Sequence, residues 1–269
     1  VERAGFRLPF MSGFAVSAAR LGLPDAGLIS YAEMLDQGRS ICDATGIPVI
    51  GDADTGYGNP VNVKRTVRGY ARAGFAAVMI EDQVSPKRCG HTRGKDVVPR
   101  GEAFARIKAA CDARDEGADV LILARTDARA VHGLDDALER ARAFADLGAD
   151  ILFVEAPRSE AEMARIGREL DRPLLANLVE DGDTPLLAHA RLEELGFKIA
   201  AYPLTLLSVA ARAMERALRG LREDRRPEPE ARLPFATLRE LVGFPDYDET
   251  ASRYADDDAA DGSGGGTPC

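Results

Sequence analysis

The fold is decided by the stretch Arg72-Ala73-Gly74-Phe75-Ala76-Ala77-Val78-Met79-Ile80-Glu81-Asp82-Gln83. A helical pattern ends at Gly74, because glycine directly after a helix is the usual C-terminal stop. An apolar run that begins at Ala77 follows at once and ends in acidic residues, which is typical of a buried strand. The same order recurs at Gly148 and Gly196. A helix that is repeatedly followed by a strand predicts a parallel sheet covered by helices.

Seven strands are expected along the chain, with helical patterns between them. The predicted strands are Leu8–Met11, Val49–Asp52, Ala77–Glu81, Val120–Ala124, Ile151–Glu155, Leu174–Asn177 and Ile199–Tyr202. The predicted helices include Asn62–Ala73, Gly101–Glu116, Leu134–Leu147, Glu160–Leu170 and Leu206–Leu221. Because the unit repeats without a switch in order and polar residues close each strand, the pattern favours a (β/α)₈ TIM barrel over an open sheet. The count is one strand short of eight, and we expect the first strand before Val1.

Composition fits one large α/β domain, since the chain has 269 residues of which 45% are hydrophobic. The net charge of −9 argues against non-specific nucleic-acid binding, which needs a basic face. No apolar run reaches the roughly 20 residues of a membrane span. Four cysteines do not suggest a disulfide framework, so a cytoplasmic location is expected. We expect a barrel over residues 1–221, a linker and helical segment over 222–254, and a disordered tail over 255–269.

An acidic motif follows the second predicted strand and reads Gly51-Asp52-Ala53-Asp54-Thr55-Gly56-Tyr57-Gly58-Asn59. Asp52 and Asp54 are paired hard-oxygen donors, which suit Mg²⁺ at the mouth of a barrel. Glu81 ends the next strand and can complete the ion's shell directly or through water. The alternatives are a solvated acidic turn for the aspartates and a helix cap or surface charge pair for Glu81 and Asp82. The two elements together favour a metal site.

A basic loop follows the third strand and carries a cysteine, in the order Pro86-Lys87-Arg88-Cys89-Gly90-His91-Thr92-Arg93-Gly94-Lys95. Nearby cations favour the thiolate and make Cys89 useful for proton transfer. The loop is long enough to act as a lid. The alternative is an inert cysteine in an exposed basic loop. The other three cysteines (Cys42, Cys111, Cys269) and two histidines (His132, His189) are interpreted as non-functional.

Arg125 stands at the end of the fourth strand, where it can hold a substrate carboxylate with two hydrogen bonds. The alternative is a structural ion pair with Asp127, and the sequence leaves both open. Glu155 and Asn177 end the next two strands. They can bind polar groups of a substrate or orient Arg125.

These motifs resemble the isocitrate lyase/phosphoenolpyruvate mutase superfamily over nearly the whole chain up to about Leu221. The resemblance is carried, in order, by Ser12-Gly13, Leu23-Pro24-Asp25, Asp52-Ala53-Asp54-Thr55-Gly56, Glu81-Asp82-Gln83, Lys87-Arg88-Cys89-Gly90-His91, Ala124-Arg125-Thr126-Asp127, Glu155-Ala156, Ala176-Asn177 and Tyr202-Pro203-Leu204. It implies a TIM barrel whose C-terminal helix is swapped between subunits, in a homotetramer built as a dimer of dimers. It also implies a Mg²⁺ cofactor, with Mn²⁺ as a substitute.

The resemblance further implies roles for individual residues. The metal would be held by Asp52, Asp54 and Glu81. Cys89 would donate the proton to carbon. The implied catalytic set is Cys89, His91, Arg125 and Glu81, and the implied substrate-binding set is Ser12, Gly13, Phe14, Asp25, Gly90, Arg125, Glu155, Asn177 and Pro203.

The implied reaction is retro-aldol cleavage of a 2-hydroxy di- or tricarboxylate to a 2-oxo acid and a carboxylate. The stretch from Cys89 to Lys95, together with Phe153-Val154-Glu155-Ala156-Pro157, resembles the dimethylmalate lyase and petal-death-protein branch more than methylisocitrate lyase, which usually has tyrosine where this chain has Phe10. The alternatives are phosphonopyruvate or carboxyphosphonate mutase-type chemistry, oxaloacetate decarboxylation, and a non-catalytic binding remnant.

Overall fold

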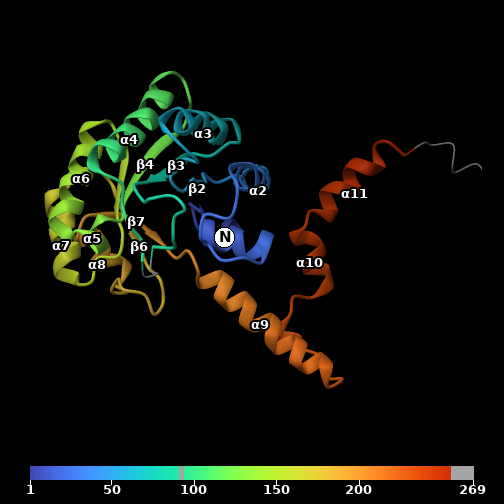
Figure 1. The fold of residues 1–269 in the computed structure, drawn as a ribbon. Coiled ribbons are helices and arrows are strands. Elements are labelled where there is room, and N and C mark those ends of the chain that lie inside the picture. The colour runs from blue at the N-terminus through green and yellow to red at the C-terminus, as the bar shows by residue number, and fades with distance from the viewer. Residues whose placement is uncertain (91–93, 256–269) are drawn as a thin grey trace, which may run out of the picture. The chain divides into compact units, whose positions relative to one another are not determined.

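The computed structural model describes residues 1–90 and 94–255, and Figure 1 shows their arrangement. Within that part of the chain, seven parallel strands form one sheet whose order follows the chain. The strands are β1 (Phe10–Met11), β2 (Ile50–Asp52), β3 (Ala77–Glu81), β4 (Leu121–Thr126), β5 (Ile151–Val154), β6 (Leu174–Asn177) and β7 (Phe197–Ala201). All seven predicted strands are therefore present, with ends displaced by at most two residues.

Helices connect successive strands. The helical elements are η1 (Glu2–Ala4), α1 (Gly13–Val16), the π-helical turn η2 (Ser17–Leu21), α2 (Tyr31–Asp43), α3 (Pro60–Arg72), α4 (Arg100–Asp115), α5 (Ala128–Val131), α6 (Leu134–Asp146), α7 (Glu160–Glu169), α8 (His189–Glu194), α9 (Thr205–Arg222), η3 (Pro229–Ala231), α10 (Phe235–Leu241) and α11 (Phe244–Ser252). None of the described helices is long and apolar enough to cross a membrane. The predicted helices correspond to α3, α4, α6, α7 and α9.

Helix α2 is not among the predicted helices, although the sequence carries a signal for it. Ser30 accepts a hydrogen bond from the Glu33 backbone, and the Glu33 carboxylate accepts one from the Ser30 backbone, 2.8 Å away. This reciprocal pair is a capping box, which satisfies two of the unpaired donors at a helix start. The spacing of serine and glutamate at Ser30 and Glu33 therefore marks the beginning of α2.

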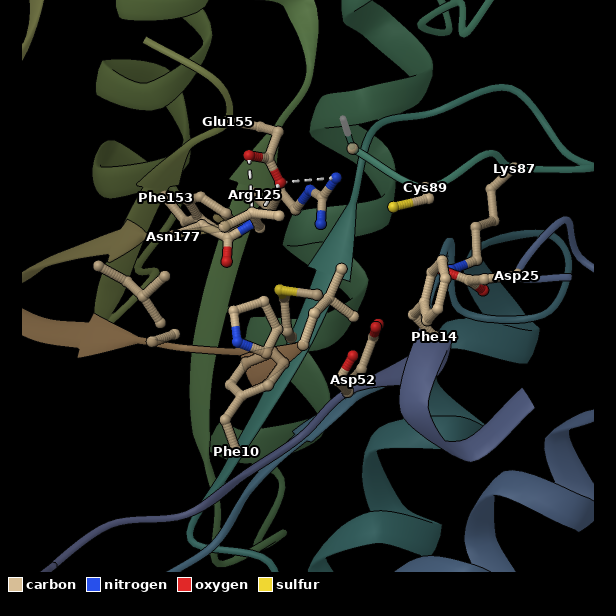
Figure 2. Close-up of a pocket in the computed structure, with 18 of the residues that line it drawn as sticks. Phe10, Phe14, Asp25, Asp52, Lys87, Cys89, Arg125, Phe153, Glu155 and Asn177 are labelled. Carbon is tan, nitrogen blue, oxygen red and sulfur yellow. Dashed lines mark hydrogen bonds and ion pairs between the residues drawn. The ribbon is translucent and has the colours of Figure 1, made fainter. Parts of the chain in front are cut away.

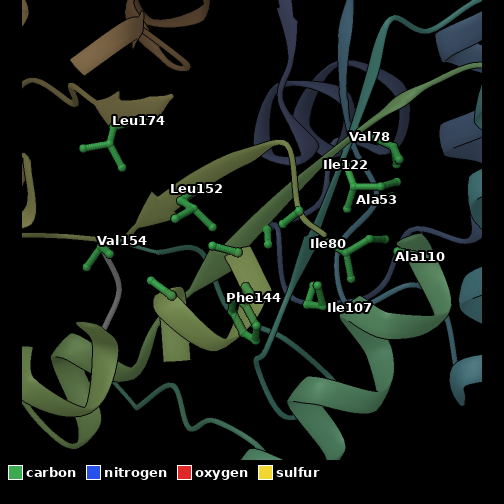
Figure 3. Packing of buried hydrophobic residues seen from close by; sticks show 14 of the residues in the cluster. Ala53, Val78, Ile80, Ile107, Ala110, Ile122, Phe144, Leu152, Val154 and Leu174 are labelled. Carbon is green, nitrogen blue, oxygen red and sulfur yellow. The ribbon is translucent and has the colours of Figure 1, made fainter. Parts of the chain in front are cut away.

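The strands alternate their side chains between two hydrophobic layers. In β3, Val78 and Ile80 belong to the larger cluster, whose members include Ile107 of α4 and Phe144 of α6 (Figure 3). Met79 belongs to a smaller cluster with residues from the strands β2 to β7, namely Ile50, Ala77, Leu123, Ile151, Phe153, Leu175 and Ala201. One cluster shared by so many strands means that the sheet curves around it. This is the packed interior of a TIM barrel.

The chain divides into two compact units, Val1–Ser208 and a second one that begins at Val209. In the second unit, α10 and α11 are joined by an ion pair of 3.0 Å between Arg239 and Asp248. Large apolar side chains of this unit are exposed in the single chain, among them Val209, Met214 and Leu218 of α9.

Candidate active site

The interior side-chain positions of the barrel end in polar residues at the carboxyl ends of the strands. Side chains alternate along a strand, so the polar residue two positions after an interior apolar one also points inward. Met79 is followed in this way by Glu81, and Leu123 is followed by Arg125. The same spacing relates Ile50 to Asp52, Phe153 to Glu155 and Leu175 to Asn177. This alternation therefore places five polar side chains at one mouth of the barrel.

A small pocket with a cavity volume of about 40 Å³ lies among these residues (Figure 2). Its lining includes ten of the predicted site residues: Ser12, Phe14, Asp25, Asp52, Cys89, Gly90, Arg125, Glu155, Asn177 and Pro203. Three more contact the pocket's residues without lining it, as described below: Gly13, Asp54 and Glu81. His91 lies outside the described residues. Every predicted site residue that the structure describes is thus in one place.

Lys87 lies in the middle of an acidic group formed by Asp25, Asp52 and Asp54. The Lys87 ammonium is 2.6 Å from Asp25 Oδ1 and 2.8 Å from Asp54 Oδ1. Asp52 accepts hydrogen bonds from the backbone of Gly13 and of Asp54, each at 3.0 Å. The Asp54 backbone has a positive φ of 49°, which bends the chain directly after β2. These contacts bring the start of α1 and the basic loop onto the tip of β2.

Burial dominates the protonation of this acidic group. It raises the pKa of Asp54 to about 6, against the opposing effect of Lys87, and Asp52 adds to the rise. Burial likewise raises the pKa of Asp25, and it raises that of Glu81 well above its ordinary value. Burial alone would lower the pKa of Lys87, but the carboxylates around it, Asp54 foremost, raise it. Lys87 therefore stays protonated, and its single positive charge faces more than one carboxylate.

The donor chemistry of this group fits a divalent cation. Asp25 Oδ1, Asp54 Oδ1 and Glu81 Oε1 are buried and accept no well-aligned hydrogen bond from the described residues, even though the first two lie close to the Lys87 ammonium. Buried carboxylate oxygens without hydrogen-bond donors are suited to a hard ion. In the described part of the chain, however, no group of three or more acidic, histidine or cysteine side chains is arranged so that it could hold a metal ion. Binding an ion here requires side-chain rearrangement.

Arg125 forms a second charged group on the other side of the pocket. Its guanidinium binds Asp127 through two hydrogen bonds, of 2.8 and 3.0 Å, and lies 3.0 Å from Glu155 and 3.3 Å from Glu81. Asn177 donates to Glu155 at 3.2 Å. The Arg125–Asp127 ion pair, which the sequence offered as an alternative to a substrate clamp, is therefore formed. Glu155 contacts the guanidinium directly, and Asn177 contacts Glu155.

Cys89 lies between the two charged groups, and Figure 2 shows its sulfur directed into the pocket toward Arg125. The next residue, Gly90, lies against the Arg125–Glu155 ion pair. A Cβ atom at Gly90 would be 2.3 Å from a Glu155 oxygen and 2.5 Å from an Arg125 nitrogen. Only glycine allows this approach of the backbone.

Several residues that contribute to the site were not predicted as site residues. Lys87 was seen only as part of a basic loop, and its place between two aspartates depends on the path of that loop. Asp127 was seen only as a partner of Arg125, and its second partner Lys95, 2.7 Å away, was missed. Three phenylalanines, Phe10, Phe14 and Phe153, give the pocket an apolar wall. Of these, Phe10 and Phe153 were not predicted as site residues.

Comparisons with known proteins agree with the fold. The family model described as phosphoenolpyruvate phosphomutase matches residues 1–222. The chain is 44% identical over 257 residues to 2,3-dimethylmalate lyase of Eubacterium barkeri, covering 95% of this chain and 89% of that protein. A crystal structure of 2,3-dimethylmalate lyase superposes with a TM-score of 0.90 at 36% identity, covering 99% of this chain and 89% of the other. A phosphonopyruvate hydrolase in complex with oxalate and Mg²⁺ superposes with a TM-score of 0.82 at 29% identity, covering 94% and 88%.

Proposed function

The chain belongs to the phosphoenolpyruvate phosphomutase family, within the isocitrate lyase superfamily, and is a carbon–carbon lyase; we propose that it cleaves a 2-hydroxy di- or tricarboxylate such as 2,3-dimethylmalate or 2-methylisocitrate. The products are a 2-oxo acid and a carboxylate. The observation that carries the proposal is that Cys89, Asp52 and Arg125 line one pocket. A proton donor, a group of anionic ligands and a cation are the parts that such a cleavage needs.

The cleavage is a retro-aldol reaction. A base takes the proton of the 2-hydroxyl group, the C2–C3 bond breaks, and its electron pair moves into an enolate of the departing carboxylate. The Cys89 thiol then donates its proton to C3 and becomes a thiolate. The proton held by the base returns to that thiolate through solvent, which restores both groups. Cys89 is suited to this step because it lines the pocket, with its sulfur directed inward.

Mg²⁺, or Mn²⁺ in its place, is the cofactor that this chemistry calls for, and Asp52, Asp54 and Glu81 would hold it. When bound, the ion supplies Lewis-acid stabilisation of the charge that develops on oxygen. The raised pKa of Asp54 and Glu81 supports this assignment, because both carboxylates gain from an added positive charge. The structural relative with bound Mg²⁺ and oxalate supports it as well.

The substrate-binding residues follow from the pocket lining. Ser12 caps the start of α1, and the backbone N–H of Gly13 donates to Asp52, so both residues lie beside the acidic group. Arg125 is the cation on the other side of the pocket, and Asn177, Pro203 and Phe14 complete the wall. We assign these residues to substrate binding, together with Asp25, Gly90 and Glu155. His91 belongs to the proposed catalytic set through the resemblance alone.

A second candidate is chemistry at a phosphorus–carbon bond, which the name of the matching family model and the likeness to phosphonopyruvate hydrolase favour. The role of Cys89 separates a carbon–carbon lyase from a phosphomutase, because the lyase must protonate the departing carbon and a phosphomutase adds no net proton to carbon. The substitution Cys89→Ser should lower kcat of a carbon–carbon lyase by about 100-fold or more and leave ground-state binding intact. Unchanged turnover in Cys89→Ser favours the phosphorus–carbon candidate.

The second unit is proposed to pair with another copy of the chain. Its exposed apolar side chains, such as Val209, Met214 and Leu218 of α9, support an exchanged helical segment in a homotetramer. Light scattering coupled to size exclusion measures the mass directly. A monomer at micromolar concentration contradicts the assembly without affecting the proposed chemistry.

The test of the proposed function is a Mg²⁺-dependent assay over a panel of 2-hydroxy and 2-oxo acids. The panel contains 2,3-dimethylmalate, 2-methylisocitrate, isocitrate, phosphonopyruvate and oxaloacetate, and the readout is the released 2-oxo acid or phosphate. We expect pyruvate or glyoxylate from one of the first three, and loss of turnover with a chelator. Turnover of phosphonopyruvate alone, or binding without any turnover, would contradict the proposal.

A further inference from the structure

Gln83 and Lys95 hold the backbone on either side of Cys89, and we propose that these two residues together set the position of its sulfur. Neither residue lines the pocket. The inference rests on the proposed function, in which Cys89 donates a proton to carbon. Both are therefore positioning residues, which act through Cys89 and not on the substrate.

Gln83 holds the peptide group that precedes Cys89. Its side-chain amide donates to the Arg88 carbonyl and accepts from the Arg88 N–H, both at 2.9 Å. Only an amide can match both backbone groups of one residue, because it carries a donor and an acceptor side by side. Gln83 is 1% exposed and directly follows Asp82 at the end of β3. Its backbone is held in turn by a bridge to Val97 and by a 2.7 Å hydrogen bond from Arg106.

Lys95 holds the carbonyl group of Gly90, the residue after Cys89. Its ammonium donates to the Gly90 carbonyl and to Asp127 Oδ1, the latter at 2.7 Å. The Lys95 side chain is 5% exposed and that of Asp127 is fully buried. Asp127 is itself fixed, since it binds Arg125 twice and its backbone N–H donates to Asp82 at 2.9 Å. The Gly90 carbonyl is thereby tied to the end of β4.

The contact of Gly90 with Arg125 and Glu155 limits movement of the Cys89–Gly90 segment toward this ion pair. A Cβ atom would have no room there, so the Gly90 backbone lies directly against the ion pair. Cys89 therefore lies between Arg88 and Gly90, two residues whose carbonyl groups are fixed to different strand ends. Proton transfer depends steeply on distance, and a shift of about 1 Å in a reacting group can cost about 100-fold in rate.

The experiment compares Lys95→Met and Gln83→Met with the control Lys108→Met. Each methionine keeps much of the side-chain volume and removes the hydrogen bonds, and Lys108 is an exposed residue of α4 that pairs with Asp112. The first readout is the rate at which iodoacetamide alkylates Cys89, followed on the Cys89 peptide by mass spectrometry. We expect it to rise about tenfold in both test variants, because the freed segment opens more often. It should change less than about twofold in the control.

The second readout separates positioning from a general loss of structure. In both test variants we expect kcat of the cleavage to fall about 100-fold, while the Kd of oxalate changes less than about threefold. Lys95→Arg keeps the charge and donors, and it should recover part of both losses. If Lys95→Met fails to fold, Gln83→Met still tests the proposal from the other side of Cys89.

An unchanged alkylation rate in both test variants overturns the proposal, whatever happens to kcat. A loss of oxalate binding as large as the loss of kcat also overturns it, because the residues would then shape the whole pocket. If the unmodified chain cleaves no member of the panel but the alkylation rate rises as expected, the proposed function fails and the positioning of Cys89 stands.

Discussion

Two groups of buried charges face the same pocket and differ in their balance of charge. In the acidic group, Asp54 shares the single ammonium of Lys87 with Asp25 and lies beside Asp52. Burial raises the pKa of Asp54 to about 6. In the arginine group, Asp127 is in contact with both Arg125 and Lys95. Burial alone would raise the pKa of Asp127, but these two cations hold it below its ordinary value.

The comparison shows that burial does not decide the state of a carboxylate by itself. Asp54 and Asp127 are both almost fully buried, at 4% and 0% exposure, yet the pKa of one is raised and that of the other is lowered. The number of neighbouring cations accounts for the difference. The acidic group lacks positive charge and is suited to receive an ion. The arginine group is compensated and is suited to hold its neighbours in place.

The largest effect is expected for Asp127→Asn, which removes the shared carboxylate of the arginine group. Lys95 would lose its ion pair with Asp127, and Arg125 would lose the nearest of its three carboxylate partners, which we expect to cost about 3–5 kcal/mol of unfolding free energy. Urea denaturation measures this loss. A cost below about 1 kcal/mol would mean that the compensation inferred for Asp127 is wrong.

Metal binding tests the acidic group and is the next largest effect. Mg²⁺ at about 100 times its Kd should stabilise the protein by about 2.7 kcal/mol. Asp54→Asn should abolish most of this gain, since it removes an anionic ligand. The metal-free variant should be at least as stable as the unmodified protein, because one of several crowded negative charges is gone. Thermal denaturation with and without Mg²⁺ measures both, and a large loss of metal-free stability in Asp54→Asn contradicts the comparison.

The pH dependence of stability should have opposite signs in the two groups. The pKa of Asp54 is higher in the folded state, about 6 against 3.8, so its contribution is complete below about pH 3.8 and is lost as the pH rises through 6. The metal-free protein should therefore gain on the order of 1–2 kcal/mol from this group between pH 7 and pH 5. Asp127 contributes stability above its unfolded pKa, which is lost at lower pH. Asp54→Asn is the control, and an unchanged pH profile in that variant would refute the assignment to Asp54.

The smallest effect is expected for an exposed pair that belongs to neither group. Lys108 and Asp112 of α4 lie 2.9 Å apart with side chains 60% and 41% exposed. Lys108→Met should change the unfolding free energy by less than about 0.5 kcal/mol, because solvent screens exposed pairs. The same urea titration gives the value. A change in unfolding free energy as large as that of Asp127→Asn would mean that burial does not account for the difference between the exposed and the buried ion pairs.

The sequence predicts the strand ends well because strand alternation is a local property. Asp52, Glu81 and Arg125 each lie two positions after an interior apolar residue, and this spacing can be read without a structure. The basic loop around Cys89 was also found, because its residues are adjacent in the chain. The family resemblance supplied the remaining pocket residues, such as Phe14 and Pro203, which no periodicity indicates.

The contacts between loops could not be predicted in the same way. Lys87 lies 33 residues from Asp54 and 62 residues from Asp25 along the chain. Nothing in the pattern of residues around each of them predicts that these side chains meet. The same holds for Lys95 and Asp127, which are 32 residues apart. Arg125 remained ambiguous because a substrate clamp and an ion pair require the same residue types. Such partners are fixed by the folded path of the chain, so they became visible only with the structure.

The order of the sheet also affects how the chain is assembled during synthesis. Each strand pairs with the strand that precedes it in the chain, as Ala77 of β3 does with Ile50 of β2. A nascent chain can therefore complete each pairing soon after the strand leaves the ribosome, without waiting for distant residues. Contacts of modest sequence separation also shorten the conformational search. The barrel should accordingly grow strand by strand from its N-terminal side.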